Sequence, residues 1–209
     1  MKNEIRNVLS GKSEVRFGKV IQAISSYLGK SKSTGEAIKG SKSFRQQETE
    51  NLVSYIDKNR LWLVDIDFSQ YVSEGAEQKV YLKDSQHVIK LNDAIYYTSW
   101  VDYFHNLLLH NYFFPDTAYD LLGFTKDDQD VLYAVVRQNF VVITNITDLK
   151  KVKEFLEQNG FSNSRYNDYV NKEIGIILED LHDENVLTNN EILFFIDTVF
   201  YLMEEFWKD

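Results

Sequence analysis

Apolar residues recur with helical spacing in the first 60 positions of the chain. Four of them lie close together near its start: Val20, Ile21, Ile24 and Leu28. This pattern predicts a helix within residues 1–28. A second helix is predicted over residues 44–59. Its apolar face consists of Leu52, Val53 and Ile56. Residues 29–43 are rich in Gly, Ser and Lys, which predicts a flexible loop between the two helices.

The pattern changes to short apolar segments from residue 61 onward. Three of them are rich in β-branched and aromatic residues: LWLVDID (61–67), QKVYLK (78–83) and HVIKL (87–91). Because turn residues separate them, they predict an antiparallel sheet. Further strands are predicted near residues 131–142, 174–178 and 192–196, and further helices over residues 96–114 and 147–161. A strand-rich half followed by a helical half indicates an α+β protein.

The composition is typical of an intracellular globular protein. Apolar residues make up 44% of the chain, which is enough for a core. Cysteine is absent, which fits a reducing compartment. No apolar run reaches the length that spans a bilayer. We therefore expect a cytoplasmic protein that makes no membrane contact.

The net charge of −9 is unevenly distributed. Residues 1–60 carry 12 Lys and Arg against 6 Asp and Glu, a net charge of +6, and the rest carry 11 against 26, or −15. Such asymmetry is typical of a nucleic-acid-binding arm or of two parts of a chain that attract each other. Because the acidic part is large and close, we favour docking of the N-terminal segment on it, as a lid or substrate platform. Binding to nucleic acid is not expected.

An acidic turn with the sequence DLHDEN, residues 180–185, lies between two apolar segments. Four residues separate Asp180 from Asn185, and Asp197 follows the second apolar segment. Carboxylates in such a place need a positive partner, because burial of an unpaired charge is costly. The alternatives are a solvated turn, with Asp197 as a helix cap, and a metal site at His182. A zinc site is disfavoured because no second His stands at ligand spacing.

A second group of candidate residues occurs in the predicted sheet. Gly75 precedes a strand that contains Val80, and Lys90 ends the strand segment VIK. Alternation along a strand places Val88 and Lys90 on the same face. The alternative interpretation of Lys90 is an exposed strand lysine. The segment VVRQNFV, residues 135–141, ends a further predicted strand.

This order of motifs resembles that of protein-kinase-like folds, in which a glycine loop, a lysine strand and a hinge precede H-R-D-x-x-x-x-N and D-F-G. The acidic turn is more similar to the D-L-H-x-x-N form of aminoglycoside phosphotransferases. Residues 73–200 as a whole resemble a minimal kinase-like family found in polyvalent proteins of bacterial mobile elements. The resemblance implies a reduced protein-kinase-like fold of the α+β class. Its parts would be an antiparallel-sheet N-lobe (61–142), a small helical C-lobe (143–209) and a helical N-terminal extension (1–60).

The resemblance also implies a role for each matched residue. Lys90 would orient the phosphates of ATP, and Asp180 would position the acceptor hydroxyl. Asn185 and Asp197 would bind Mg²⁺. The nucleotide would contact Gly75, Val80, Val88, Lys90, Gln138, Phe140 and Leu187. Of these, Gln138 and Phe140 belong to the hinge whose backbone would bond to adenine, and Leu187 would form the floor of the pocket.

Acidic residues near the motifs carry further expectations. The helix after Lys90 offers no Glu to pair with the lysine, and Asp102 is its nearest acid. Alternation directs Glu179 away from Asp180. Glu184 is expected to face solvent.

The function implied by the resemblance is an ATP- and Mg²⁺-dependent phosphotransferase that acts on a protein hydroxyl or a small molecule. Its partners would be a nucleotide and an unknown phosphate acceptor. One alternative is a pseudokinase or nucleotide-binding interaction module. An alternative biological role is that of a mobile-element toxin or anti-host factor.

Overall fold

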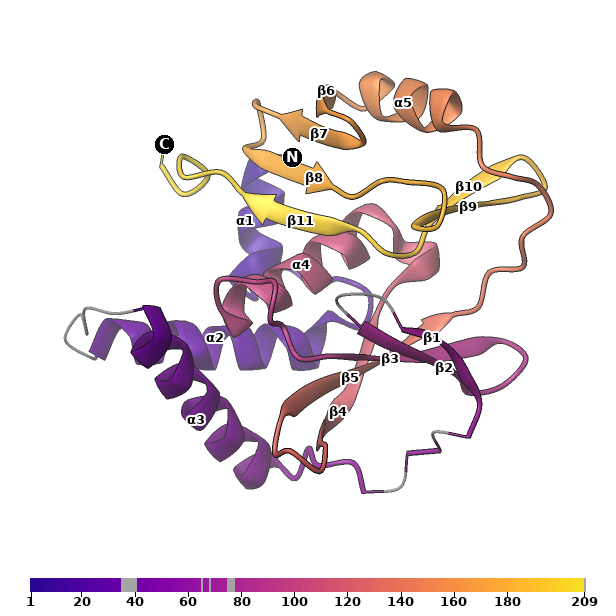
Figure 1. Cartoon of the computed structure of the whole chain (residues 1–209). Coiled ribbons are helices and arrows are strands. Elements are labelled where there is room, and N and C mark those ends of the chain that lie inside the picture. Colours follow the sequence, from indigo (N-terminus) through magenta and orange to yellow (C-terminus); the bar gives the residue numbers. More distant parts are fainter. Residues whose placement is uncertain (35–40, 65, 68, 75–77, 209) are drawn as a thin grey trace.

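The described strands form three antiparallel sheets, and helix α4 (Trp100–Phe113) lies between the two larger ones (Figure 1). The structure is a computed structural model and describes the whole chain except residues 35–40, 65, 68, 75–77 and 209. The five-stranded sheet has the order β1 (Tyr71–Glu74), β2 (Gln78–Leu82), β3 (His87–Asn92), β5 (Leu132–Asn139), β4 (Asp120–Lys126). The four-stranded sheet has the order β11 (Val199–Leu202), β8 (Ile176–Glu179), β7 (Asp168–Asn171), β6 (Ser162–Arg165). A hairpin of β9 (Val186–Asn189) and β10 (Ile192–Phe195) forms the third sheet.

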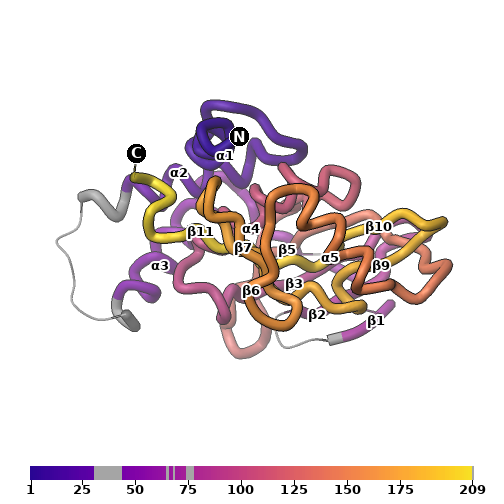
Figure 2. The backbone as a smooth tube through the Cα atoms, turned by 90° about the horizontal axis from the view of Figure 1, so that it is seen from above, coloured from indigo at the N-terminus to yellow at the C-terminus, as the bar shows by residue number. Residues whose placement is uncertain are grey.

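Aromatic contacts join α4 to both larger sheets. Phe104 packs edge-on against Phe124 of β4, with ring centroids 6.3 Å apart. At the other end of the helix, Phe113 stacks on Phe200 of β11 at 5.5 Å. Figure 1 shows the four-stranded sheet above α4 and the five-stranded sheet below it, and Figure 2 looks down on the same arrangement from above. The predicted α+β class with an antiparallel sheet is confirmed.

Three helices precede the sheets: α1 (Lys2–Leu9), α2 (Gly18–Thr34) and α3 (Ser41–Asn59). The single helix predicted within residues 1–28 is therefore two helices, separated by a turn in which Gly11 has a φ of 74°. Helices α2 and α3 also enter both ends of the predicted loop at 29–43, so that loop is shorter than expected. Its central residues, 35–40, lie outside the described residues.

The N-terminal helices dock on the body of the protein through apolar side chains. Ile21, Ile24 and Leu28 are at most 1% exposed, and α2 packs along α4. The prediction that Val20 shares this face is wrong, because Val20 is 39% exposed. Helix α2 turns Ile21, Ile24 and Leu28 toward the body, and Val20 lies about 100° around the helix from Ile21, outside this face. Basic residues add polar contacts to backbone oxygens, such as that from Arg6 Nη2 to the Phe206 carbonyl at 2.6 Å.

The register of the five-stranded sheet places the predicted pocket residues on one face. Val80 of β2 lies opposite Lys90 of β3, and Val88 lies opposite Gln138 of β5. Directly opposite residues point to the same face of a sheet, and so do residues two apart on one strand. The four side chains therefore share the face that is turned toward the β9–β10 hairpin.

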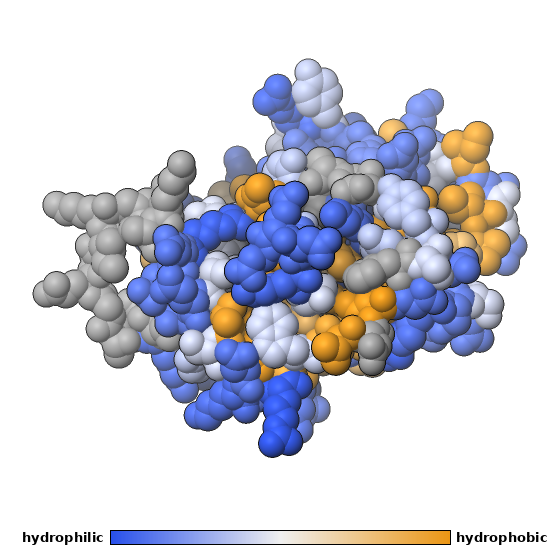
Figure 3. Space-filling model, turned by 60° about the horizontal axis from the view of Figure 1, so that its bottom comes forward, coloured by the Kyte–Doolittle hydropathy of each residue, from blue (hydrophilic) through white to orange (hydrophobic). Residues whose placement is uncertain are grey.

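The outer face of this sheet carries a small second core. Ile89, Leu91 and Val135 are buried there, and Leu63 and Ile66 pack over them. The strand predicted over 61–67 is mostly absent. In the described part of that segment, Trp62 forms a single bridge to Phe124, and the rest covers the sheet as an irregular chain. Figure 3 shows that hydrophobic residues on this side lie in separate patches among hydrophilic ones.

The prediction of a helical C-terminal part is wrong. Residues 143–208 contain one α-helix, α5 (Leu149–Gln158), and six strands, β6 to β11. Each of these strands has four residues, and β6 is exposed at every position. Such short, partly polar segments carry little periodicity, so only the apolar ones near 174–178 and 192–196 were predictable. The predicted helix over 147–161 is confirmed as α5.

The start of α4 is held by a carboxylate from α3. Glu48 is 4% exposed, and its Oε2 accepts a hydrogen bond from the Trp100 backbone N–H at 2.7 Å. Ser99 caps the same end and accepts from Asp102 N at 3.1 Å. A carboxylate at a helix N-terminus satisfies free N–H groups and interacts favourably with the helix dipole. Glu48 thereby links the N-terminal helices to α4.

We expect Glu48→Ala to lower the free energy of unfolding by about 1–3 kcal/mol, because it leaves buried N–H groups without an acceptor. Urea unfolding at constant pH measures this change. Glu50→Ala is the matched control, since Glu50 is exposed on the same helix and should change the stability by less than about 0.5 kcal/mol. Equal effects of the two substitutions would contradict the capping role.

Candidate functional site

A cavity of about 310 Å³ lies between the five-stranded sheet and the β9–β10 hairpin. Strands β1, β2, β3 and β5 line one side, and residues 184–187 and 196–197 line the other. Most predicted site residues border it: Val80, Val88, Lys90, Gln138, Phe140, Asn185, Leu187 and Asp197. Gly75 lies outside the described residues. The lining residues all come from positions 72–197, so the expected role of residues 1–60 as a lid over this cavity finds no support.

Lys90 is buried at the base of the cavity. Its side chain is 4% exposed, and its Nζ lies 3.6 Å from Asp197 Oδ2. Nζ also donates to the backbone oxygen of Ile196 at 2.9 Å and lies 5.5 Å from the centre of the Tyr119 ring. Desolvation lowers the pKa of the Lys90 ammonium, and the charge of Asp197 opposes this effect. The interpretation of Lys90 as an exposed strand lysine is wrong.

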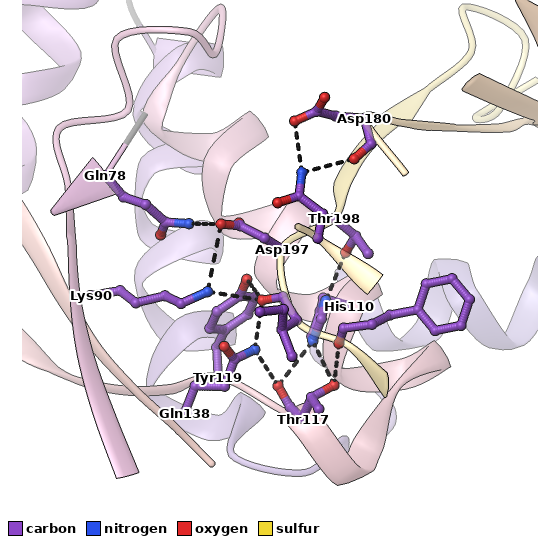
Figure 4. Close-up of polar contacts among 12 residues, drawn as sticks. Gln78, Lys90, His110, Thr117, Tyr119, Gln138, Asp180, Asp197 and Thr198 are labelled. Atoms are coloured by element: carbon purple, nitrogen blue, oxygen red, sulfur yellow. Dashed lines mark hydrogen bonds and ion pairs between the residues drawn. The ribbon is translucent and has the colours of Figure 1, made fainter. Parts of the chain in front are cut away.

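Asp197 is also held by Gln78, whose amide donates to Asp197 Oδ2, the same oxygen that faces Lys90 Nζ (Figure 4). Two donors thus occupy one oxygen of the carboxylate. Asp197 precedes strand β11, so its interpretation as a helix cap is wrong. Sequence reasoning missed Gln78. The available signal was strand alternation, since Gln78 stands two residues before Val80 and therefore on the same face.

The acidic turn has a backbone conformation that is unusual for a side-chain-bearing residue. Asp180 has a φ of 65°, in the left-handed region, which Asp and Asn tolerate better than other residues do. Its backbone N–H donates to Asp168 Oδ1 at 3.1 Å. Strain of this kind is concentrated at functional sites. It directs the Asp180 carboxylate toward solvent, where the side chain is 55% exposed.

Asn185 connects Asp180 to the cavity. Its Nδ2 donates to the Asp180 backbone oxygen and to Asp180 Oδ2, both at 2.8 Å. These acceptors fix which end of the amide is the nitrogen, so Asn185 Oδ1 keeps its lone pairs for another partner. The backbone oxygen of Asn185 accepts from Ile196 N at 2.9 Å, which ties the turn to the segment that carries Asp197.

His182 supports the same turn. Its Nδ1 accepts from Glu184 N at 3.3 Å, and its Nε2 lies 3.3 Å from Asp180 Oδ1 and 3.1 Å from Asn185 Nδ2. Glu184 is exposed, as expected, and it also lines the cavity. The pKa of Glu179 is raised by burial and by the charges of Asp168 and Asp180.

The hinge differs in detail from the expectation. The Gln138 side chain is buried and donates to the Thr117 oxygen at 2.7 Å and to the Ile196 oxygen at 2.9 Å. The Phe140 backbone N–H donates to the Gln86 oxygen at 2.7 Å. Polar groups alternate in direction along a strand, so those of Asn139 point away from β3. Asn139 lines the cavity together with Phe140.

Helix α4 supplies no carboxylate to Lys90. Asp102, its only acid, accepts from Ser99 Oγ at 2.7 Å at the start of the helix. Near its other end, the helix presents His110, which bonds to Thr198. Sequence reasoning missed this pair because the two residues are 88 positions apart.

The donor set of the cavity suits Mg²⁺. This ion prefers oxygen ligands and usually takes one or two protein carboxylates together with phosphate oxygens. Asp197 Oδ1 and Asn185 Oδ1 are oxygens of this kind on one cavity wall. Within the described residues, no group of three or more His, Cys, Asp or Glu could hold a metal ion by itself. No described helix is long and apolar enough to cross a membrane.

Comparison with known proteins identifies the family. No curated protein and no solved structure matches the chain. A family model described as serine/threonine/tyrosine kinase found in polyvalent proteins matches residues 45–204. The match begins in α3, ahead of the expected start at residue 61, and includes Glu48 and every predicted site residue. The chain therefore belongs to this family of serine/threonine/tyrosine kinases found in polyvalent proteins.

Proposed function

We propose that this protein is an ATP- and Mg²⁺-dependent phosphotransferase that acts on a hydroxyl group. The observation that carries the proposal is the cavity itself. Lys90, Asn185 and Asp197 all line this cavity, together with apolar residues of the sheet and the hairpin. A buried, paired lysine beside a carboxylate and an amide oxygen suits phosphates and their metal ion. The five-stranded sheet would be the N-lobe, and the residues after it the C-lobe.

The nucleotide would lie between the sheet and the hairpin. Val80 and Val88 would cover the adenine from the sheet, and Leu187 would contact it from β9. Lys90 would reach the phosphate oxygens. Because Asp197 Oδ2 is engaged by Lys90 and Gln78, Oδ1 would face the metal together with Asn185 Oδ1. Mg²⁺, when bound, supplies positive charge that offsets the charge of the phosphates.

Asp180 would act on the acceptor. It lies outside the cavity, bonded to Asn185, and its carboxylate is more than half exposed. An acceptor hydroxyl arriving from solvent would donate its proton to an Asp180 oxygen while the hydroxyl oxygen forms a bond to the terminal phosphorus of ATP. The bond from that phosphorus to the bridging oxygen would break at the same time, and ADP would leave with the electron pair. His182, at 3.3 Å from Asp180 Oδ1, would hold the carboxylate in place. The acceptor would be a protein hydroxyl or a small molecule.

The second candidate is a nucleotide-binding module without turnover. The observation that favours it is the absence of a carboxylate from α4 beside Lys90, since the only acid of that helix caps its N-terminus. In such a module, the cavity would still bind the nucleotide. Substitution of Asp180, considered below, distinguishes the two candidates.

We expect ATP with Mg²⁺ to stabilise the folded protein, because a ligand that binds only the folded state shifts the unfolding equilibrium. At a ligand concentration of 100 times Kd, this effect is about 2.7 kcal/mol. Asp197→Ala should abolish the Mg²⁺-dependent part of the stabilisation. Thermal unfolding with ATP, with and without Mg²⁺, measures both terms.

The control for this experiment is Asp183→Ala. Asp183 is an exposed carboxylate of the acidic turn that does not line the cavity, so its replacement should leave the stabilisation unchanged. An unshifted melting temperature of the parent protein at millimolar ATP would refute the proposed function.

A further inference from the structure

A buried histidine on α4 contacts the segment that carries Asp197. His110 is fully buried, and its Nε2 lies 2.9 Å from the backbone oxygen of Thr117. Its Nδ1 lies 2.7 Å from Thr198 Oγ1. A carbonyl oxygen only accepts, so Nε2 must carry the proton. Nδ1 is therefore bare and accepts the hydroxyl proton of Thr198.

The histidine keeps this tautomer near neutral pH. The pKa of His110 is lowered to about 3, mainly by burial and in smaller part by the positive charge of Lys90, while the hydrogen bond to the Thr117 backbone opposes the shift. Aromatic rings enclose the imidazole, with the Tyr119 ring centroid 4.4 Å and the Phe114 ring centroid 5.6 Å away. The imidazole thus has one donor and one acceptor in fixed directions.

Other side chains hold the same segment from the remaining sides (Figure 4). Thr117 Oγ1 donates to the Phe195 oxygen at 2.5 Å. The Ile196 oxygen accepts from Lys90 Nζ, Tyr119 Oη and Gln138 Nε2. Without the Thr198 hydroxyl bond, residues 195–197 would keep these contacts, but the residue directly after Asp197 would lose its hydrogen bond to α4, and the next contact of the chain with that helix would be Phe200, whose N–H donates to Asn106 Oδ1. The direction of the Asp197 side chain depends on both flanks.

We propose that His110 is a positioning residue that acts through Thr198 to fix the direction of the Asp197 carboxylate toward the metal ion. The contacts that hold the segment around Asp197 belong to the fold alone, whereas the effect of that segment on metal binding rests on the proposed function. The inference also explains why a threonine follows Asp197: its hydroxyl is the donor that the bare Nδ1 of His110 requires.

Thr198→Val and Thr198→Ser form a matched pair for the test. Valine keeps the shape of threonine but lacks the hydroxyl, and serine keeps the hydroxyl but lacks the methyl group. The backbone N–H groups of Ile196 and Asp197 both donate to the Asn185 oxygen, at 2.9 and 3.4 Å. We expect their hydrogen exchange to be about tenfold faster in Thr198→Val and close to the parent rate in Thr198→Ser.

The second measurement concerns the metal. The Mg²⁺ concentration that half-saturates the ATP complex should rise about tenfold in Thr198→Val and stay unchanged in Thr198→Ser. ATP binding without Mg²⁺ should stay within about twofold in both, because Thr198 does not line the cavity. A purely structural effect would alter the melting temperature but not this difference between binding with and without metal.

Each outcome decides the inference. Unchanged hydrogen exchange in Thr198→Val, or equal acceleration in both variants, would overturn it. A different pair of results separates the two proposals. If hydrogen exchange is faster in Thr198→Val alone but the parent protein does not bind Mg²⁺–ATP, the proposed function is refuted and the role of His110 in fixing the segment stands. If Thr198→Val does not fold, ¹⁵N NMR of the parent decides, because we expect His110 to be neutral and protonated on Nε2 at pH 7. A proton on Nδ1 would overturn the inference.

Discussion

Asp180→Asn will lower the rate of phosphoryl transfer by about 10²- to 10⁴-fold, the contribution typical of a positioned base. The substitution keeps the size of the side chain and removes its ability to take a proton. Asparagine also tolerates the left-handed backbone that Asp180 adopts, with a φ of 65°, so the turn should persist. The affinity for ATP should stay within a few-fold, because Asp180 does not line the cavity. Steady-state release of ADP with varied ATP separates kcat from KM.

The matched control is Asp183→Asn, which removes the same charge from the same turn at an exposed position outside the cavity. It should leave the rate nearly unchanged. Glu184 is unsuited as a control because it lines the cavity mouth. Lys90→Ala should lower both the rate and the ATP affinity. Transfer by Asp180→Asn at the parent rate would exclude Asp180 as the base. If the parent protein and Asp180→Asn both bind ATP and neither transfers phosphate, the nucleotide-binding module without turnover would be favoured.

The free energy of unfolding will fall as the pH is lowered from about 6.5 toward 3. The pKa of His110 is about 3 in the folded protein, against about 6.5 for an exposed histidine. Between these values, the unfolded chain binds a proton that the folded protein excludes, so acid favours unfolding. Each pH unit in this interval costs about 1.4 kcal/mol, which gives roughly 2–3 kcal/mol at pH 4.5.

His110→Gln isolates this contribution. Glutamine can still donate to the Thr117 oxygen. We expect the variant to have a lower free energy of unfolding than the parent at pH 7.5. Because glutamine does not titrate, this free energy should fall less toward pH 4.5 than that of the parent. His87→Gln serves as the control, because His87 lies at the surface beside Asp84. Urea unfolding at a series of pH values gives the curves. Parallel curves for the parent and His110→Gln would show that His110 does not cause the acid sensitivity.

Much of the candidate site could be predicted from local pattern. Alternation along one strand placed Val88 and Lys90 on the same face, and the structure has them there, with Val80 opposite Lys90 on the neighbouring strand. The short interval between Asp180 and Asn185 predicted a turn, and in the structure Asn185 Nδ2 lies 2.8 Å from Asp180 Oδ2. Such relations involve neighbours in the sequence, so they are readable without a fold. The roles of these residues remain predictions.

The errors arose where distant parts of the chain decide the structure. Strands β6 and β7 were not predicted, because their sequences are short and partly polar and pairing within the sheet stabilises them. Glu48 and Trp100 are 52 positions apart, and no local pattern links them. Helix α2 buries Ile21, Ile24 and Leu28 but leaves Val20 exposed, although all four were assigned to one apolar face. Periodicity describes a helix but does not fix how it is rotated against its neighbours.

The carbonyl oxygen of Ile196 receives three donors, from Lys90, Tyr119 and Gln138, yet a carbonyl has only two lone pairs. The three bonds therefore compete, and each is weaker than it would be alone. When one donor is lost, the other two can strengthen, so a single substitution costs less than the sum of contacts suggests. Loss of a second donor leaves a single bond to this oxygen, so it lowers the stability by more than the first loss does. The segment beside Asp197 is thus robust to one mutation and fragile to two.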